Sequence, residues 1–236
     1  MFGGWAPCLA PLPELPVARI RSGPGVFVIP KEVSQSTVVM AHATDVRLGE
    51  DEDYFASQVG NAILGASGLT SRIMSRVRTE RGYAYSGSSL WTAPRRSQGI
   101  VGAITQTRSE STIAATRLLL EIIEEMVQTP PGAEEVADAL DDFANGFVFN
   151  FESPSQIVSR QMIYLAEDLP QDWLSRYLEG IQAVTPASVH QVFERHVRPD
   201  QMVILIVGNP EDFDEAPEVL GPVTYLGGDQ AGRRPQ

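Results

Sequence analysis

The sequence predicts an α+β fold in which helices pack on one face of a mixed, mostly antiparallel sheet. Two observations carry this prediction. The expected elements run strand, strand, helix, helix, strand, strand, a series of helices, strand, which is not the regular alternation of a doubly wound parallel sheet. The chain has 236 residues, of which 43% are hydrophobic, enough to bury one sizeable core.

Two strands and a helix open the folded part. Residues 25–29 read as a short strand, and residues 36–42 as a β-branched, apolar strand expected near the centre of the sheet. Residues 51–64 read as a helix, because Asp51, Glu52 and Asp53 favour its positive N-terminal end and apolar residues recur on one face. The small-residue segment 65–68 ends it.

A second helix and a hairpin follow. An apolar stripe at a four-residue spacing predicts a helix over 70–81, and Gly82 predicts its end. Residues 83–92 and 99–107 read as antiparallel strands joined by a turn at 94–97. Strict alternation along the first strand places five side chains on one side: Tyr83, Tyr85, Gly87, Ser89 and Trp91.

Helices dominate the rest of the chain. Residues 111–128 read as a helix, and a second carries apolar residues at helical spacing: Val136, Leu140, Phe143 and Phe147. Three prolines each mark the expected start of a further helix: Pro154, Pro170 and Pro186. Residues 202–207 read as the last strand. The expected division is a proline-rich linker at 1–25, one α+β domain at 26–215 and a tail at 216–236.

Composition excludes several classes of function. The net charge is −12 and no basic cluster stands out, which argues against a nucleic-acid partner. No apolar run reaches the roughly 18 residues of a membrane span, and residues 1–5 do not resemble a signal peptide. The single cysteine, Cys8, cannot form an internal disulfide. The bacterial periplasm and the cytoplasm both fit this composition.

A hydrolytic metal site needs two or three His or carboxylate ligands that converge on one point. The chain has three histidines, of which His190 and His196 lie close in sequence. His190 and Glu194 could share a helix face, but His196 is about 600° further around the helix than His190. That spacing matches neither His-Glu-x-x-His nor His-x-x-Glu-His. We therefore expect a polar helix end rather than a metal site, and we expect His42 to be a satisfied core or edge residue. No metal ligand is assigned to this chain.

The segment 68–86 carries a more specific pattern. Ser71-Arg72-Ile73 is followed by an Arg-x-x-Arg-Gly-x-x-Tyr-Ser arrangement formed by Arg78, Arg81, Gly82, Tyr85 and Ser86. The pattern resembles the second, non-catalytic domain of the pitrilysin/insulinase family of zinc metallopeptidases, which includes the mitochondrial processing peptidase. The likeness covers roughly residues 5–215, although Tyr83 stands where the family more often has leucine.

The fold that the resemblance implies is that of one half of a LuxS/mitochondrial processing peptidase-like metallohydrolase. The resemblance also implies a function. The family's catalytic domain carries His-x-x-Glu-His, which is absent from this sequence. The chain is thus expected to be inactive alone and to partner a catalytic domain, in the same precursor or a separate chain, that holds the Zn. Arg78 and Tyr85 are implied to reach that zinc site and contact a peptide or unfolded protein substrate.

Two other functions compete with this one. The chain could be a catalytically inert subunit of a larger complex, in which the broad sheet face serves assembly alone. It could also be an independent metalloenzyme that uses His190, Glu194 and His196. Peptide binding distinguishes a substrate-holding role from that of an inert subunit. Metal analysis of the purified chain tests whether it is an independent metalloenzyme.

Overall fold

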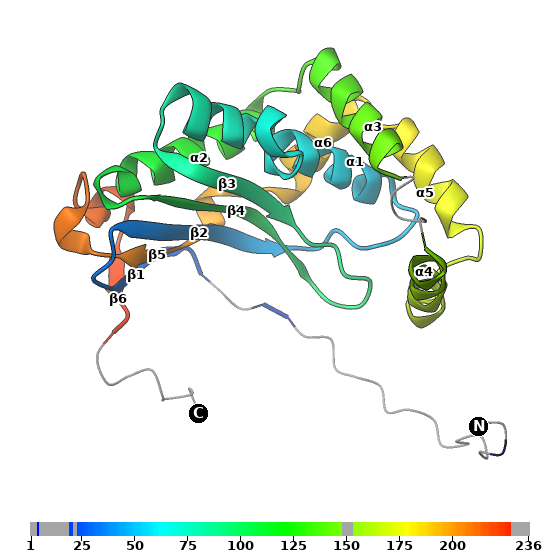
Figure 1. Ribbon diagram of the computed structural model, residues 1–236, viewed down its shortest axis with the longest axis horizontal. Helices are drawn as coiled ribbons and strands as arrows, with labels where there is room; N and C mark the ends of the chain where they lie inside the picture. Colours follow the sequence, from blue (N-terminus) through cyan, green and yellow to red (C-terminus); the bar gives the residue numbers. More distant parts are fainter. Residues whose placement is uncertain (1–3, 5–18, 21–22, 148–152, 228–236) are drawn as a thin grey trace.

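The structure, a computed structural model, describes residues 4, 19–20, 23–147 and 153–227 and contains a six-stranded sheet (Figure 1). The strand order is β3-β4-β2-β5-β1-β6. Three of the five strand pairings are antiparallel, whereas β1 runs parallel to both β5 and β6. The strands are β1 (Gly25–Pro30), β2 (Gln35–Thr44), β3 (Ala84–Trp91), β4 (Gly99–Arg108), β5 (Val203–Gly208) and β6 (Val223–Tyr225).

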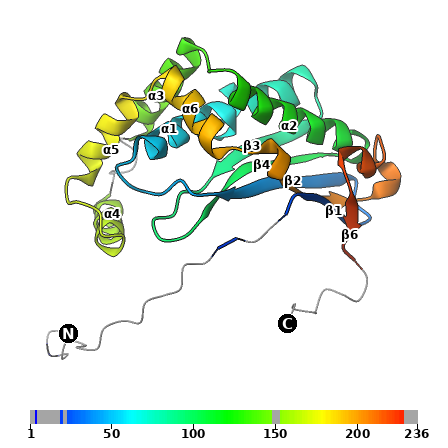
Figure 2. The same ribbon diagram turned by 180° about the vertical axis from the view of Figure 1, so that it is seen from behind.

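The helices cover one face of this sheet. In both views α1, α2 and α6 lie against it with α3 and α5 outside them, while α4 stands apart beyond the β3–β4 hairpin (Figures 1 and 2). The predicted α+β architecture is therefore confirmed. The helices are α1 (Glu52–Asn61), α2 (Thr112–Gln128), α3 (Ala133–Phe147), α4 (Pro154–Ala166), α5 (Trp173–Gln182) and α6 (Pro186–His196).

The core lies between the sheet and this helical layer. Alternate residues of β2 are buried beneath the helices, among them Val38 and Met40, which are completely buried. Phe193 of α6 and Trp91 of β3 meet edge to face with ring centroids 5.1 Å apart. The β2 strand pairs on both sides, with β4 and β5, so the prediction that this segment is central is confirmed.

Two predicted helices contain π-helical turns. The helix predicted over 51–64 begins as α1 and ends as the π-helical segment Ala62–Ala66. The helix predicted over 70–81 is π-helical at Met74–Glu80, which we call the motif helix. The first of these segments packs its backbone closely against the sheet: a Cβ on Gly65 would lie 2.2 Å from the amide nitrogen of Ser89 on β3. Periodicity located both helices but does not distinguish these wider turns.

Several helix boundaries follow the predicted signals. Asp51 caps α1 by accepting the amide hydrogen of Asp53 at 2.9 Å. Pro154 and Pro186 occupy the first turns of α4 and α6, behind capping boxes at Ser153 and Thr185. The prediction for Pro170 is shifted by a turn, because α5 begins only at Trp173.

The chain's last part differs from the prediction. The sheet takes up Val223–Tyr225 as β6, beside β1, so the ordered fold extends past residue 215 into the expected tail. Three residues are too few for strand periodicity to be recognised. Most of the expected linker, with Cys8, and residues 228–236 lie outside the described residues, as does the side chain of Phe147. No helix among the described residues is long and apolar enough to cross a membrane.

Candidate functional site

The candidate site begins at a β-bulge in β3. Ala84 pairs with Thr107 and Ser86 with the next residue of β4, Gln106, so Tyr85 is the extra residue. Ala84 is buried, whereas the side chain of Tyr85 is 81% exposed. The predicted alternation is therefore wrong at this end of the strand: Tyr85 does not point into the helical layer with Trp91, because the bulge shifts the register by one residue.

Two buried threonines of β4 hold the bulge. Thr107 donates its hydroxyl hydrogen to the carbonyl oxygen of Tyr83 at 2.6 Å, and Thr105 donates to that of Ser86 at 2.7 Å. Both threonines are 1% exposed. The carbonyl groups on either side of Tyr85 are thus fixed by side chains, which compensates for the interrupted ladder and keeps Tyr85 in place.

Arg78 lies at the other side of the same junction. The motif helix ends at Glu80, and Gly82 follows with a φ of +63°, a left-handed conformation that favours glycine. The turn brings the chain back so that the guanidinium carbon of Arg78 lies 4.9 Å from the ring centroid of Tyr85, a cation–π contact. The structure brings together the two site residues predicted from the sequence.

The pair lines a cavity of about 430 Å³ at the beginning of β3. Polar side chains from neighbouring strands share its wall, among them Gln35, Gln106 and Arg108. Arg108 is paired with Glu110 at 2.9 Å, whereas Arg78 makes no ion pair with any residue that the structure describes. The cavity therefore offers an entering ligand the guanidinium of Arg78, the exposed phenol of Tyr85 and the side-chain amides of Gln35 and Gln106.

Two other arginines of the segment 68–86 are structural, which sequence reasoning missed. Arg72 forms a bidentate pair with Glu135 of α3, and Arg76 pairs with Glu125 of α2 at 2.6 Å. These contacts fix the motif helix against its neighbours and leave Arg78 facing the cavity. The partners lie 63 and 49 residues away along the chain, so no local pattern could identify them.

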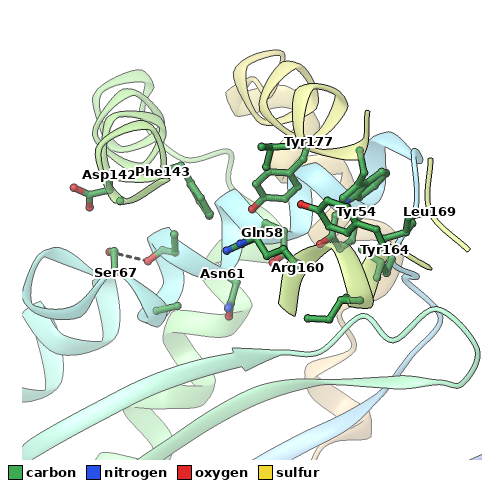
Figure 3. Close-up of a pocket in the computed structure, with 17 residues that line it drawn as sticks. Tyr54, Gln58, Asn61, Ser67, Asp142, Phe143, Arg160, Tyr164, Leu169 and Tyr177 are labelled. Carbon is green, nitrogen blue, oxygen red and sulfur yellow. Dashed lines mark hydrogen bonds between the residues drawn. The ribbon is translucent and has the colours of Figure 1, made fainter. Parts of the chain in front are cut away.

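A second, larger cavity of about 640 Å³ lies between α1, α3, α4 and α5 (Figure 3). Its wall includes the aromatic side chains of Tyr54, Tyr164, Trp173 and Tyr177. Burial raises the pKa of both Tyr54 and Tyr177 above the ordinary value of a tyrosine. The sequence analysis did not anticipate this cavity, because its residues come from four helices.

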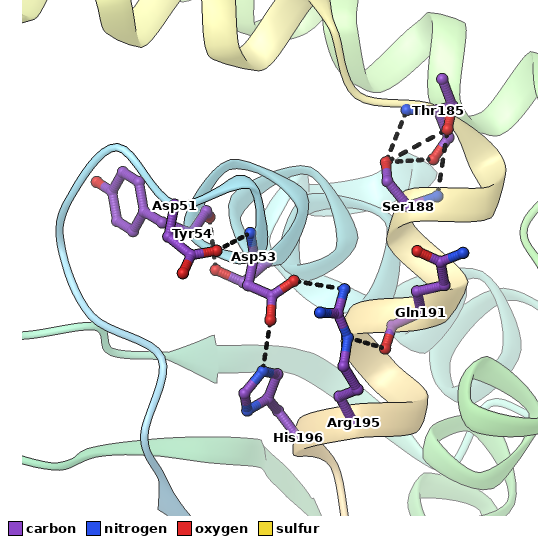
Figure 4. A network of polar contacts seen from close by, with 9 residues as sticks. Asp51, Asp53, Tyr54, Thr185, Ser188, Gln191, Arg195 and His196 are labelled. Atoms are coloured by element: carbon purple, nitrogen blue, oxygen red, sulfur yellow. Dashed lines mark hydrogen bonds and ion pairs between the residues drawn. The ribbon is translucent and has the colours of Figure 1, made fainter.

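The histidines tested as metal ligands do not converge. His190 contacts the carbonyl oxygen of Val127 at 3.0 Å, whereas His196 lies 2.8 Å from a carboxylate oxygen of Asp53 (Figure 4). Asp53 also pairs with Arg195, so this cluster ties the start of α1 to the end of α6. In the described part of the chain no group of three His, Cys, Asp or Glu side chains is placed to hold a metal ion.

His42 is a satisfied core residue, as predicted. It is 5% exposed, its Nδ1 lies 2.7 Å from the carbonyl oxygen of Ala43, and its Nε2 accepts the amide hydrogen of Arg198 at 2.9 Å. Burial lowers the pKa of His42, so the ring is neutral near pH 7. It connects β2 to the loop after α6.

Comparison with solved structures identifies the fold. The chain is similar to the peptidase M16 inactive domain from Pseudomonas fluorescens, with 28% identity and a TM-score of 0.71, covering 82% of this chain and 46% of that one. It is also similar to a protease from Helicobacter pylori, with 15% identity, a TM-score of 0.68 and coverage of 79% and 44%. No curated protein matches.

A third similar structure is the periplasmic protease PqqL from Escherichia coli, with 14% identity, a TM-score of 0.65 and coverage of 85% of this chain and 22% of that one. The chain thus spans less than half the length of each of these three proteins. Residues 2–142, more than half of the chain, match the family described as "Peptidase M16 inactive domain". The chain therefore belongs to the M16 (pitrilysin/insulinase) family of peptidases, as a non-catalytic domain of that family.

Proposed function

We propose that this chain is the substrate-binding half of a zinc metalloendopeptidase and that Arg78 and Tyr85 act at a zinc site held by the catalytic half. The observation that carries the proposal is their placement: an 81% exposed phenol lies against a guanidinium at the wall of a cavity. An exposed tyrosine held by a bulge contributes little to the core. Bulges are common next to active sites, where they re-aim a side chain.

The two side chains suit the two demands of peptide hydrolysis. When water attacks a peptide carbonyl, negative charge develops on the carbonyl oxygen, and the hydroxyl of Tyr85 can donate a hydrogen bond to it. The guanidinium of Arg78 can donate to a carbonyl of the same substrate and hold its backbone in position. The cation–π contact keeps the two groups beside each other before substrate enters.

The zinc in this proposal belongs to the catalytic half, because the described residues here offer no ligand set for it. Bound there, zinc supplies an activated water at neutral pH. This chain's contribution is to hold the peptide or unfolded protein and to stabilise the charge that develops on it. The catalytic half carries His-x-x-Glu-His and either precedes this chain in one precursor or is a separate subunit. In the second case the two chains form a dimer.

The test is peptide cleavage by this chain mixed with its His-x-x-Glu-His partner. Tyr85→Phe removes only the donor, so we expect kcat to fall on the order of 10² to 10³-fold. Arg78→Ala is expected to raise KM as well, because the anchor acts on bound substrate. Tyr225→Phe is the matched control, since this tyrosine is 50% exposed and lies on β6. Equal activity of Tyr85→Phe and Tyr225→Phe would refute the assignment.

The alternative function is a catalytically inert subunit of a larger assembly. The observation that favours it is the face of the sheet that no described helix covers, on which Val39, Ile104 and Leu205 lie in one row and are only half-buried (Figures 1 and 2). Such a face suits assembly whether or not peptide binds. The chain is similar in fold, with 17% identity and a TM-score of 0.66, to a chain of complex III2 from Candida albicans. Assembly with a partner, combined with no affinity for peptides, would support this alternative over the substrate-binding role.

A further inference from the structure

The larger cavity, between α1, α3, α4 and α5, has no part in the proposed peptide chemistry (Figure 3). Its volume of about 640 Å³ lies within the range of about 300–1,000 Å³ that is usual for small-molecule sites. None of the residues that line it also lines the cavity of Arg78 and Tyr85. A ligand bound here therefore leaves the candidate active site open.

Polar side chains face this cavity from α1. Tyr54, Gln58 and Asn61 recur at i, i+4 and i+7, so they form one stripe of the helix, and all three line the wall. A stripe that served only the core would be apolar, as it is at the neighbouring buried residues Phe55 and Val59. The stripe that begins at Tyr54 is instead suited to contact with a molecule that carries polar atoms.

The wall has hydrogen-bonding capacity that the protein does not use. The rings of Tyr54 and Tyr177 lie with centroids 6.4 Å apart, and neither hydroxyl hydrogen-bonds to a residue that the structure describes. Gln58 donates from its side-chain nitrogen to the hydroxyl of Ser57 at 3.4 Å, while its side-chain oxygen accepts from no described residue. The side chains of Tyr54, Gln58 and Tyr177 project into the cavity from α1 and α5 (Figure 3). They can both donate to and accept from one bound molecule.

The π-helical segment Ala62–Ala66 keeps part of the cavity open. It places Ala62, Ala66 and Ser67 in the wall, where their small side chains leave space for a ligand. The wider turn closes at Ser67, whose amide and hydroxyl both donate to the carbonyl oxygen of Ala62, at 3.2 and 2.9 Å. Single π-helical turns of this kind occur frequently at functional sites.

The outer wall is helix α4, which the β3–β4 hairpin holds in place. Arg96 donates to the carbonyl oxygen of Ala166 at 2.8 Å, and Arg95 donates to that of Asp168 at 3.1 Å. Tyr164 is the one buried residue of this helix, so apolar packing alone gives it little support. The hairpin contacts therefore set the width of the cavity, which is a built site and not a gap between loosely placed helices.

Charges of both signs stand in the wall. Asp142 contributes a carboxylate from α3, and Arg160 contributes a guanidinium from α4 (Figure 3). A cation would be favoured by the first and disfavoured by the second, and the reverse holds for an anion. Because a charge taken out of water without a suitable partner is costly, an uncharged ligand fits this cavity best.

We propose that the cavity binds a neutral, planar aromatic small molecule that carries hydrogen-bonding groups. The rings of the ligand meet the aromatic side chains of the wall, which are Tyr54, Tyr164, Trp173 and Tyr177, face to face with an offset or edge to face. Its polar atoms bond to the phenol hydroxyls and to the amide of Gln58. This inference does not depend on the proposed function, because it uses neither Arg78 nor Tyr85.

The first test uses N-phenyl-1-naphthylamine, a neutral aromatic probe whose fluorescence rises in apolar surroundings. The full chain is expected to bind it saturably, with one probe molecule per chain. Ala66→Trp places a large side chain in the cavity from an exposed position, so it should weaken binding at least tenfold. Ala187→Trp is the matched control, because this alanine is also exposed and lies on α6, outside the cavity wall. Circular dichroism establishes that each variant is folded.

A second test measures the polar contacts. 1-Naphthol and naphthalene, which differ by one hydroxyl, compete with the probe. The double variant Tyr54→Phe/Tyr177→Phe keeps both rings, so affinity for naphthalene should not change. Affinity for 1-naphthol should fall about three- to tenfold, the net value of one hydrogen bond. Tyr225→Phe is the control and should bind both competitors like the wild type, because Tyr225 lies on β6, outside the cavity wall.

Several outcomes would overturn the inference. They are absent or unsaturable probe binding, equal binding by Ala66→Trp and Ala187→Trp, and an unchanged ratio of the two competitors' affinities in the double phenylalanine variant. Displacement of the probe by the half that carries His-x-x-Glu-His would also overturn it, because the cavity would then belong to a contact between the two halves.

Discussion

Arg72 and Glu135 form a bidentate ion pair in which Nε and Nη2 of the guanidinium each lie 2.8 Å from one carboxylate oxygen. Glu135 also accepts the amide hydrogen of Gly132 at 2.8 Å, so the pair fixes the first turn of α3 to the residues before the motif helix. The Arg72 guanidinium holds the pKa of Glu135 below its ordinary value. The arginine nearest the start of the motif is therefore structural, unlike Arg78.

This pair makes stability depend on pH. Because the pKa of Glu135 is lower in the folded chain than its ordinary value of 4.5, the pair's contribution is complete above about pH 4.5 and is lost as pH falls through the folded pKa. Arg72→Ala is expected to lower the free energy of unfolding by about 0.5–1 kcal/mol at pH 7, since both partners are partly exposed. Urea unfolding should show this difference shrinking below pH 4.5; an equal difference at pH 7 and pH 3 would contradict the assignment.

The Asp53 cluster supports a second prediction, which concerns the joint between α1 and α6. Asp53 accepts from both Arg195, at 2.6 Å, and His196, at 2.8 Å, and its side chain is only 15% exposed (Figure 4). Asp53→Asn removes the charge that both contacts use, so the free energy of unfolding should fall by about 1.5–3 kcal/mol. Urea unfolding at neutral pH measures it.

Asp51→Asn is the matched control for that experiment. Asp51 lies two residues earlier and caps α1 through its carboxylate. Asparagine caps a helix as well as aspartate does, so this substitution should change stability by less than about 0.5 kcal/mol. If both variants lose the same stability, the loss comes from the helix N-terminus and not from the contacts to α6.

The sequence was sufficient for elements whose cause is local. Asp51 and Gly82 are end signals that act within one turn, and both occur where they were predicted. The strand 36–42 was expected to be central because its residues are β-branched and apolar, and it pairs on both sides. In each case the residues that determine the structure are neighbours in the chain.

The parts that were missed depend on distant residues. The bulge at Tyr85 is held by Thr105 and Thr107 from the next strand, so alternation within β3 alone gave the wrong side for Tyr85. The role of Arg72 depends on Glu135, which no helix spacing relates to it. Arg78 and Tyr85 were selected by family resemblance rather than by physical pattern, and their proximity emerged only with the fold.

Gly82 allows a third prediction, about the turn that brings Arg78 to Tyr85. Its φ of +63° is costly for residues with a Cβ, and no atom lies within 4 Å of the position that a Cβ would take. Gly82→Ala is therefore expected to lower the free energy of unfolding by about 1–2 kcal/mol through backbone strain alone. Gly82→Asn should cost less, because asparagine enters this region more readily. Equal losses in urea unfolding would contradict the assignment of the cost to φ, because alanine and asparagine differ in how readily they adopt a positive φ.

The last prediction concerns the bulge itself. Thr107→Val keeps nearly the same shape but leaves the carbonyl oxygen of Tyr83 without its donor in a site that is 1% exposed. An unsatisfied buried acceptor costs about 1–3 kcal/mol, so the variant should be destabilised by that amount. Hydrogen exchange at residues 84–86 should accelerate more than elsewhere in the sheet, because the local restraint is lost.

Thr37→Val is the control, since its half-exposed hydroxyl makes no hydrogen bond to a described residue, and a change of less than about 0.5 kcal/mol is expected. If Thr107→Val instead exchanges uniformly faster across the sheet, the threonine stabilises the fold as a whole and does not specifically hold Tyr85 in the position that the proposed chemistry requires.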